Sequence, residues 1–226
     1  MSNQIPKILW QTWYKKDIPG KIRESIDCMK QLHSDYIYNF FSDDDIHDYI
    51  KKNFSNEIYL AYCKLNVGAA KADLWRYLVM YDVGGVYIDL DSIIYTNVDS
   101  LLEDRTRMVI SREKNKDVFV QWCLMCPPRH DIMKYCIEKS VENIYNNSHS
   151  NVVFLTGPIV YSQSIQKFFK DVSVYDKSDF CLNSMTDTCA KFYRNDYTGY
   201  ALFSNPEKYL LYKDKPHWST EERVFK

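Results

Sequence analysis

The amino-acid sequence predicts an α/β fold in which a Rossmann-like mixed sheet is flanked by helices. Short runs of β-branched and aromatic residues alternate with longer segments whose apolar residues recur at helical spacing. The 226 residues are enough for one α/β domain and too few for two full domains with a linker. Between residues 68 and 91, a helical segment, a glycine pair and a β-favouring run lead into two aspartates. Open α/β sheets bind ligands at such strand ends, so we expect the site there.

The N-terminal part of the chain predicts a strand, a helix and a second strand. Residues 5–13 are mainly apolar and indicate a buried first strand, with Pro6 tolerated at its start. Pro19 suits the first turn of a helix that runs to Leu32. Residues 36–41 are aromatic and β-favouring, and they predict the second strand.

Three successive aspartates at positions 43–45 allow two interpretations. They could form an acidic metal cluster, or they could begin a helix. We favour the helix, because Ser42 or Asp43 can cap its first turn and the other carboxylates interact favourably with its positive end. A further short helix is expected at residues 55–65.

The helix predicted from Gly68 onward carries two stripes of residues at helical spacing. Its apolar stripe consists of Leu74, Tyr77, Leu78 and Tyr81. The second stripe consists of Ala69, Asp73, Arg76 and Met80. Asp73 and Arg76 therefore point the same way, either to pair with each other or to contact a ligand.

Gly84 and Gly85 are expected to end this helix, because glycine enters the left-handed region at little cost. Residues 86–88 then favour a strand, whose period of two sends Asp89 and Asp91 to the same side. Two neighbouring carboxylates repel each other, and their hard oxygen atoms suit Mg²⁺, Mn²⁺ or Ca²⁺. A solvated acidic turn is the alternative interpretation of this pair.

The second half of the chain begins with a hairpin-like pair of strands at residues 108–111 and 118–125. Pro127 and Pro128 precede an amphipathic helix, whose apolar stripe we expect to dock on the sheet. That stripe consists of Ile132, Met133, Cys136, Ile137, Val141 and Ile144. Next come a polar loop (146–151), an apolar run (152–155), a turn at Thr156-Gly157-Pro158, a helix to Lys170, a strand (172–175) and an irregular polar stretch (176–199).

Composition and charge argue against several classes of partner. A net charge of −1 and a pI near 6.5 give no basic field for nucleic acid or for an anionic membrane. Seven cysteines without a framework spacing indicate free thiols in a reducing compartment, including Cys123 and Cys126 in an apolar run. The sequence has neither a signal core nor an apolar run of about eighteen residues, so a soluble, cytoplasmic protein without a transmembrane segment is expected.

Two segments together resemble the signature of the Asp-x-Asp sugar transferases: Ala70-Lys71-Ala72-Asp73-Leu74-Trp75-Arg76 and Gly84-Gly85-Val86-Tyr87-Ile88-Asp89-Leu90-Asp91. This family is related to yeast initiating α-1,6-mannosyltransferase and to α-1,4-galactosyltransferase, and it shares a donor-binding core with the clostridial glucosylating toxins. The resemblance is specific because an Asp-x-x-Arg helix, a glycine pair and an Asp-x-Asp strand occur in fixed order. It implies a GT-A fold with residues 1–226 as a single catalytic domain.

The resemblance also implies roles for individual residues. Asp89 and Asp91 are expected to hold the metal with His217, and the catalytic group is expected to be Asp91, Asp89 and Arg76. The donor is expected to contact Gln11, Thr12, Trp13, Asp73, Arg76, Asp89, Gly157 and Trp218. His217 and Trp218 belong to a C-terminal segment that folds back over metal and diphosphate in relatives, although residues 220–225 depart from the family's pattern.

The implied reaction is metal-dependent transfer of a hexose from a nucleotide sugar to the hydroxyl of a glycan or another acceptor, with retention of anomeric configuration. The expected cofactor is Mn²⁺ or Mg²⁺. A UDP-sugar such as UDP-glucose is the first expected donor and GDP-mannose is the second. We name no catalytic base, because retention in this family implies front-face attack by the acceptor hydroxyl.

Two other functions are compatible with parts of the sequence. Haloacid-dehalogenase-like phosphatases also place an Asp-x-Asp after an apolar strand, but usually near the N-terminus and before Gly-Thr. Here 88 residues precede Asp89, and Ser92-Ile93 follow Asp91. A catalytically weak module that only binds a nucleotide sugar is the other alternative, because the sequence shows no acceptor site.

Overall fold

The computed structural model describes residues 4–94, 97–102, 104–111, 118–169, 180–183, 189–193, 202–204, 208–213 and 224–225. The strand expected at residues 172–175 lies outside these ranges, as do His217 and Trp218.

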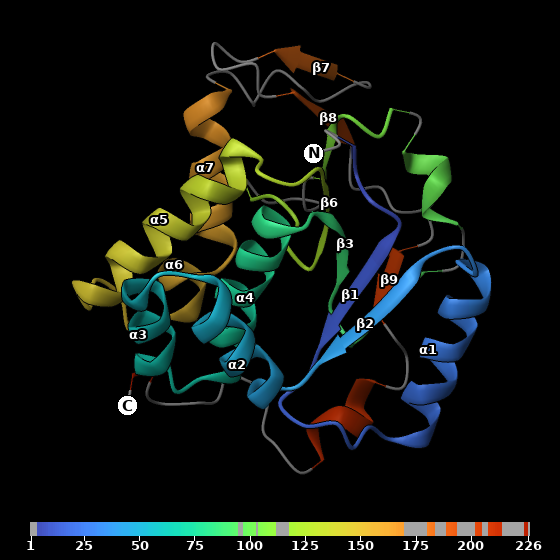
Figure 1. The fold of residues 1–226 in the computed structure, drawn as a ribbon, viewed down its shortest axis with the longest axis horizontal. Helices are drawn as coiled ribbons and strands as arrows, with labels where there is room; N and C mark the ends of the chain where they lie inside the picture. Colours follow the sequence, from blue (N-terminus) through green and yellow to red (C-terminus); the bar gives the residue numbers. More distant parts are fainter. Residues whose placement is uncertain are drawn as a thin grey trace.

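A seven-stranded mixed sheet runs through the described structure (Figure 1), which confirms the predicted fold class. β1 lies between β2 and β3 and is parallel to both. β6 is antiparallel to β3 and β5, β8 is parallel to β5, and β7 is antiparallel to β8. In sheet order, the strands are β2 (Ile37–Phe41), β1 (Ile8–Thr12), β3 (Gly85–Ile88), β6 (Cys123–Cys126), β5 (Met108–Ser111), β8 (Cys189–Tyr193) and β7 (Phe180–Asn183).

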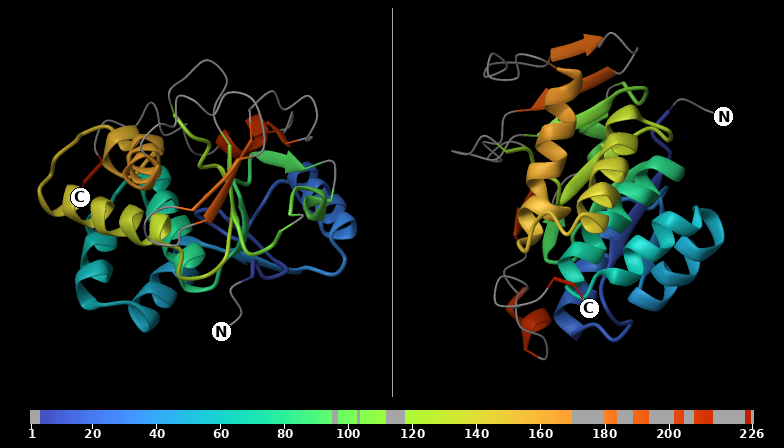
Figure 2. Two further views of the ribbon diagram at one scale, coloured as in Figure 1. Left: turned by 90° about the horizontal axis from the view of Figure 1, so that it is seen from above. Right: turned by 90° about the vertical axis from the view of Figure 1, so that its left-hand side faces the viewer.

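Helices lie on both faces of this sheet (Figure 2). On one face, Met29 of α1 (Gly20–Leu32) packs with Leu9 and Val86. The opposite face is covered by α2 (Asp43–Asn53), α3 (Asn56–Lys64), α4 (Gly68–Asp82), α5 (Asp131–Tyr145), α6 (Val152–Leu155) and α7 (Pro158–Phe168). Further elements are the 3₁₀ helices η1 (Val98–Leu101) and η3 (Lys208–Tyr212) and an antiparallel pair, β4 (Ser92–Ile94) with β9 (Leu202–Ser204).

Side chains alternate between the two faces along the central strands, as the period of two requires. Trp10 and Tyr87 belong to the core cluster beneath α4, whereas Leu9 and Val86 belong to the cluster beneath α1. Asp89 follows Tyr87 by two residues and shares its side of the sheet, because the Tyr87 hydroxyl donates to Asp89 Oδ1. The strand pattern therefore directs Asp89 toward α4.

The helix interpretation of the three aspartates is confirmed. Ser42 is the N-cap of α2, and its hydroxyl accepts a hydrogen bond from the backbone N–H of Asp45 at 3.4 Å. The Asp45 carboxylate in turn accepts from the backbone N–H of Ser42 at 3.0 Å, which completes a capping box. This reciprocal pair fixes the first turn of α2 and therefore the position of Asp43.

Two expectations for the second half of the chain are wrong, and one segment without an assigned element is a helix. α5 begins at Asp131, and its apolar stripe packs chiefly against α4 and α7, because α4, most of whose residues are buried, lies between it and much of the sheet. The apolar run at residues 152–155, to which no element was assigned, forms helix α6, whose first turn is capped by Asn151. The stretch expected to be irregular contains β7 and β8, whose pairing with each other and with β5 is not a local property of the sequence.

The cysteines Cys123, Cys126 and Cys136 are free and buried, which confirms the free-thiol interpretation for these three. Burial, with a smaller contribution from the charge of Asp89, raises the pKa of Cys123 to about 12, so it packs as a neutral thiol. Within the described ranges, none of the helices is both long and apolar enough to cross a membrane.

Gly84 and Gly85 form the turn between α4 and β3. Their φ angles are 74° and 111°, values that L-residues with a side chain adopt only at a cost. The indole Nε1 of Trp10 donates to the Gly84 carbonyl at 2.9 Å and ties the turn to β1. The turn therefore determines where β3 begins and where the residues after it lie.

We expect Gly84→Ala to destabilise the fold by about 2 kcal/mol or more, because a methyl group at positive φ would also meet Pro128 N at 2.7 Å and Cys126 O at 2.8 Å. Gly20→Ala is the control, since nothing lies within 4 Å of its added Cβ. Urea unfolding of both variants measures the difference in free energy of unfolding. Equal midpoints for the two variants would contradict the role assigned to the turn.

Candidate active site

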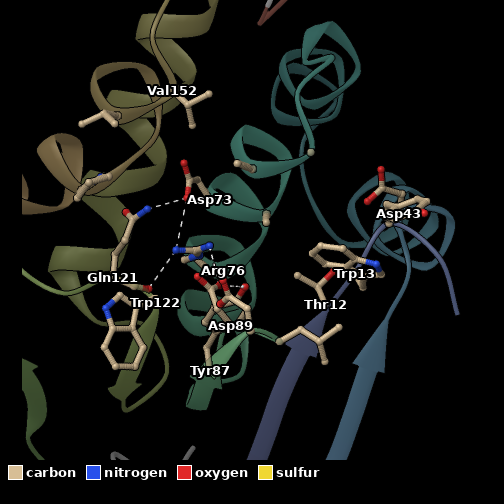
Figure 3. Close-up of a pocket in the computed structure, with 18 of the residues that line it drawn as sticks. Thr12, Trp13, Asp43, Asp73, Arg76, Tyr87, Asp89, Gln121, Trp122 and Val152 are labelled. Atoms are coloured by element: carbon tan, nitrogen blue, oxygen red, sulfur yellow. Dashed lines mark hydrogen bonds and ion pairs between the residues drawn. The ribbon is translucent and has the colours of Figure 1, made fainter. Parts of the chain in front are cut away.

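A cavity of about 240 Å³ opens beyond the carboxyl ends of β1 and β3 (Figure 3). Residues after β1 and at the start of α2 form one end, and the residues before β6 together with α6 form the other. One side of α4 lies between these ends. The lining includes six of the predicted site residues, which are Thr12, Trp13, Asp73, Arg76, Asp89 and Asp91.

The position of the cavity follows from the strand order. β2 pairs with one side of β1 and β3 with the other, so the chain reverses direction across the sheet at β1. Such a reversal leaves a crevice beyond the strand ends, where open α/β sheets bind ligands. β3 ends at Ile88, as the strand expected at residues 86–88 does, and Asp89 and Asp91 lie in the turn that follows it. The turn still directs both residues to the cavity.

The guanidinium of Arg76 is the centre of the polar network and is only 4% exposed. Its Nη2 donates to Asp89 Oδ1 at 2.9 Å, and its Nη1 lies 3.4 Å from Asp73 Oδ1. Nη1 also donates to the Gln121 backbone carbonyl at 3.2 Å. Burial alone would lower the pKa of Arg76, but Asp89, Tyr87 and Asp73 raise it above its ordinary value, so the group stays charged. Arg76 thereby connects α4 with the residues that follow β3 and precede β6.

The Asp73 carboxylate is buried, and each of its oxygens accepts a hydrogen bond. Gln121 Nε2 donates to Oδ1 at 2.6 Å, and Thr156 Oγ1 donates to Oδ2 at 3.0 Å. The Tyr77 hydroxyl orients Gln121 by donating to its Oε1 at 2.5 Å. Burial raises the pKa of Asp73, and the charge of Arg76 and the two hydrogen bonds oppose this rise. The carboxylate is therefore held in one orientation from both sides.

Opposing electrostatic influences act on the Asp89 carboxylate. Its Oδ1 accepts from Arg76 and, at 2.7 Å, from the Tyr87 hydroxyl. Burial raises the pKa of Asp89 to about 7, and the charge of Asp91 adds to the rise while Arg76 and Tyr87 oppose it. A further positive charge between Asp89 and Asp91 would relieve this repulsion.

Asp91 is held by the C-terminal part of the described chain. The hydroxyl of Tyr212, the last residue of η3, donates to Asp91 Oδ2 at 3.0 Å. The Tyr212 ring also meets Trp13 edge to face, with ring centroids 5.7 Å apart. Residues 208–212 thus fold back to the cavity beside Asp91 and Trp13.

Two predicted donor-site residues do not line the cavity. Gln11 points to the α1 side of the sheet because it alternates with Trp10 and Thr12, and its Nε2 donates to the Asp89 carbonyl at 3.4 Å. Gly157 lies behind the residues that line the cavity. An added Cβ there would come within 2.8 Å of the backbone of Val152 and Val153. Its lack of a side chain lets α6 and α7 approach each other, and the adjacent Pro158 reaches the cavity instead.

No cluster of three His, Cys, Asp or Glu side chains occurs among the residues that the structure describes. Asp89 and Asp91 therefore form a two-carboxylate set. Such a set fits Mg²⁺ or Mn²⁺, which commonly completes its shell with water and substrate phosphate oxygens. The predicted third ligand, His217, and the predicted donor contact, Trp218, lie outside the described residues.

Sequence reasoning missed several cavity residues: Asp43, Tyr14, Tyr87, Gln121, Trp122 and Tyr212. Tyr87 precedes Asp89 by two residues, so strand periodicity could have placed it on the same side. Gln121 is a polar residue within the otherwise apolar 118–125 run, which is a weak signal. Tyr212 has no local signal, because only the tertiary fold brings it to Asp91.

Comparison with known proteins agrees with this arrangement. Residues 19–108 match the family described as "Glycosyltransferase sugar-binding region containing DXD motif". An uncharacterized glycosyltransferase of Acanthamoeba polyphaga mimivirus is 27% identical over 182 residues, which cover 76% of this chain and 71% of that protein. Inositol phosphoceramide mannosyltransferase 3 of Schizosaccharomyces pombe is 34% identical over 104 residues, which cover 45% of this chain and 29% of that enzyme.

Among solved structures, the PaToxG glycosyltransferase superposes with a TM-score of 0.56 at 20% sequence identity, covering 74% of this chain and 71% of that chain. At this identity the likeness concerns the fold alone, which is of the GT-A type. The chain thus spans most of the viral relative but less than a third of the yeast enzyme.

We expect Thr156→Val to destabilise the protein by about 1.5–3 kcal/mol, because the change leaves Asp73 Oδ2 without its hydroxyl donor in a buried site. Thr156→Ser keeps the hydroxyl and is the matched control. Urea unfolding at neutral pH measures both variants. The support assigned to Asp73 is refuted if valine costs no more than serine.

Proposed function

We propose that this chain transfers a hexose from a nucleotide sugar to a hydroxyl of a glycan or another acceptor. The match of residues 19–108 to the glycosyltransferase sugar-binding region that contains a DXD motif supports this proposal. The observation that carries the proposal is the pair of carboxylates, Asp89 and Asp91, in one cavity with Trp13 and Asp73. In this proposal residues 1–226 form one catalytic domain.

The cavity offers a separate place for each part of the donor (Figure 3). Thr12 and Trp13 lie at the end beyond β1, which suits the nucleoside. Asp89 lies nearer the middle, and Asp91 follows it by two residues and also lines the cavity, which suits the diphosphate. Asp73 lies toward the end formed by α6, where its carboxylate can accept hydrogen bonds from hexose hydroxyls. The order of these groups matches the order of parts in a nucleotide sugar.

A divalent cation, Mn²⁺ or Mg²⁺, would be held by Asp89 and Asp91 together with the donor diphosphate. When bound, it supplies Lewis-acid stabilisation of the negative charge that grows on the leaving diphosphate. The chain's own contribution is to hold the two carboxylates in place. Arg76 and Tyr87 fix Asp89 through Oδ1, and Tyr212 fixes Asp91 through Oδ2.

Arg76 acts mainly as a positioning residue in this proposal. Its guanidinium is almost fully buried and already contacts Asp73, Asp89 and the Gln121 carbonyl. It therefore orients the hexose through Asp73 and the diphosphate site through Asp89. No side chain is assigned as a base, because retention by front-face attack uses the acceptor hydroxyl itself.

Two donors are candidates, UDP-glucose and GDP-mannose. The similarity to inositol phosphoceramide mannosyltransferase 3 of Schizosaccharomyces pombe over 104 residues supports mannose as the transferred sugar. The acceptor is proposed only as a hydroxyl compound.

The proposal predicts that Asp91→Asn lowers kcat/KM for metal-dependent donor turnover at least about 100-fold, because it removes one of two charges that hold the metal. The fold should be kept, since Asp91 contributes no side chain to the apolar core. Initial rates of donor hydrolysis or transfer, measured with a series of nucleotide sugars and Mn²⁺, test this expectation.

Glu138→Gln is the control of equal charge change, because Glu138 is exposed on α5. Removal of the metal with a chelator should abolish turnover by the wild type and by this control alike. Near-normal turnover by Asp91→Asn would contradict the assignment of Asp91 as a metal ligand.

A further inference from the structure

One end of the cavity contains an acidic side chain that the proposed reaction does not use. Asp43, the first residue of α2, lines this end with Trp13 (Figure 3). It lies on the far side of Trp13 from the sugar-binding end, beyond the carboxyl end of β1. This is the end that the proposed function gives to the nucleoside.

The position of Asp43 is fixed by its surroundings. The capping box between Ser42 and Asp45 holds the backbone of the first turn of α2. Lys71 of α4 donates from Nζ to Asp43 Oδ2 at 3.0 Å, and both side chains remain partly exposed. A carboxylate oxygen has more than one acceptor site, so this bond leaves capacity at both oxygens of Asp43. Asp43 is therefore an oriented acceptor facing the cavity.

The nucleobases differ in how their polar edges would meet such an acceptor. Guanine presents two adjacent donors, N1–H and the N2 amino group, which match the two oxygens of a carboxylate. Uracil presents a single N3–H between two carbonyl acceptors, which would repel the carboxylate. Adenine and cytosine each place one amino donor beside an acceptor nitrogen. Among the common bases, guanine alone fits in a bidentate manner.

We propose that Asp43 selects a guanine nucleotide as the activating part of the donor. The inference rests on the proposed function and deepens it, because it ranks GDP-sugars above the UDP-sugars that were first expected. Aromatic faces such as that of Trp13 stack on any base and give affinity without discrimination. Discrimination between bases therefore depends on the Asp43 carboxylate, which attracts the donors of guanine and repels the carbonyl oxygens of uracil.

The test measures binding of GDP, IDP and UDP to the wild-type protein in the presence of Mn²⁺, by isothermal titration calorimetry. IDP keeps the N1–H of guanine and lacks only the N2 amino group. We expect GDP to bind about tenfold or more tighter than IDP and than UDP, since each charge-assisted hydrogen bond is worth roughly that factor. This comparison needs no variant and is independent of any effect on folding.

Two variants complete the test. Asp43→Asn should weaken GDP binding about tenfold or more, leave UDP binding equal or stronger, and remove the difference between GDP and IDP. Asp44→Asn, which changes the same charge at the exposed neighbouring position, should behave as the wild type. The melting temperature of each variant without nucleotide shows whether the fold is kept.

The outcomes separate this inference from the proposal on which it rests. Absence of binding by any of the three nucleotides would overturn the proposed function together with the role of Asp43. Tighter binding of UDP than of GDP, or equal binding of GDP and IDP by the wild type, would overturn the role of Asp43 and leave the glycosyltransferase proposal intact.

Discussion

The site depends on the burial of one guanidinium between two carboxylates. Removing Arg76 and Asp73 from water, and Asp89 in part, is costly unless each charge finds oriented partners. The protein meets this requirement with groups from separate elements: α4 supplies Arg76 and Asp73, the turn after β3 supplies Asp89, and the segment before β6 supplies the Gln121 carbonyl. Satisfying the charges therefore aligns these elements at the cavity. The geometry of the site and the packing of the central sheet therefore depend on the same interactions.

Much of this arrangement could be predicted because it is local. The glycine pair, the helical spacing of Asp73 and Arg76, and the capping residues before α2 each follow from properties of a few neighbouring residues. Periodicity placed the first strands and helices nearly where they are observed. Periodicity could also have excluded Gln11 from the cavity, because Gln11 alternates with the cavity residue Thr12 along β1.

The remainder could not be predicted from neighbouring residues. Gln121 reaches Asp73 only because β6 pairs antiparallel with β3. That pairing cannot be predicted from the sequence pattern of either strand. Tyr212 reaches Asp91 across more than a hundred residues of chain. The apolar stripe of α5 was recognised, but its partner was not, since amphipathicity indicates a buried face without indicating what covers it.

The sequence of α4 explains why the cavity has both free volume and charged side chains. The helix residues that line the cavity are Gly68, Ala69, Ala72, Asp73 and Arg76, which recur at helical spacing along one side. The small residues come first and leave space beside Trp13 and Asp43, whereas the charged residues follow, nearer to the sheet. The opposite sides of α4 are buried among other helices, so this side cannot rotate away. A change in the rotation of α4 would therefore alter cavity volume and charge placement together, which couples the nucleoside end to the sugar end through one rigid element.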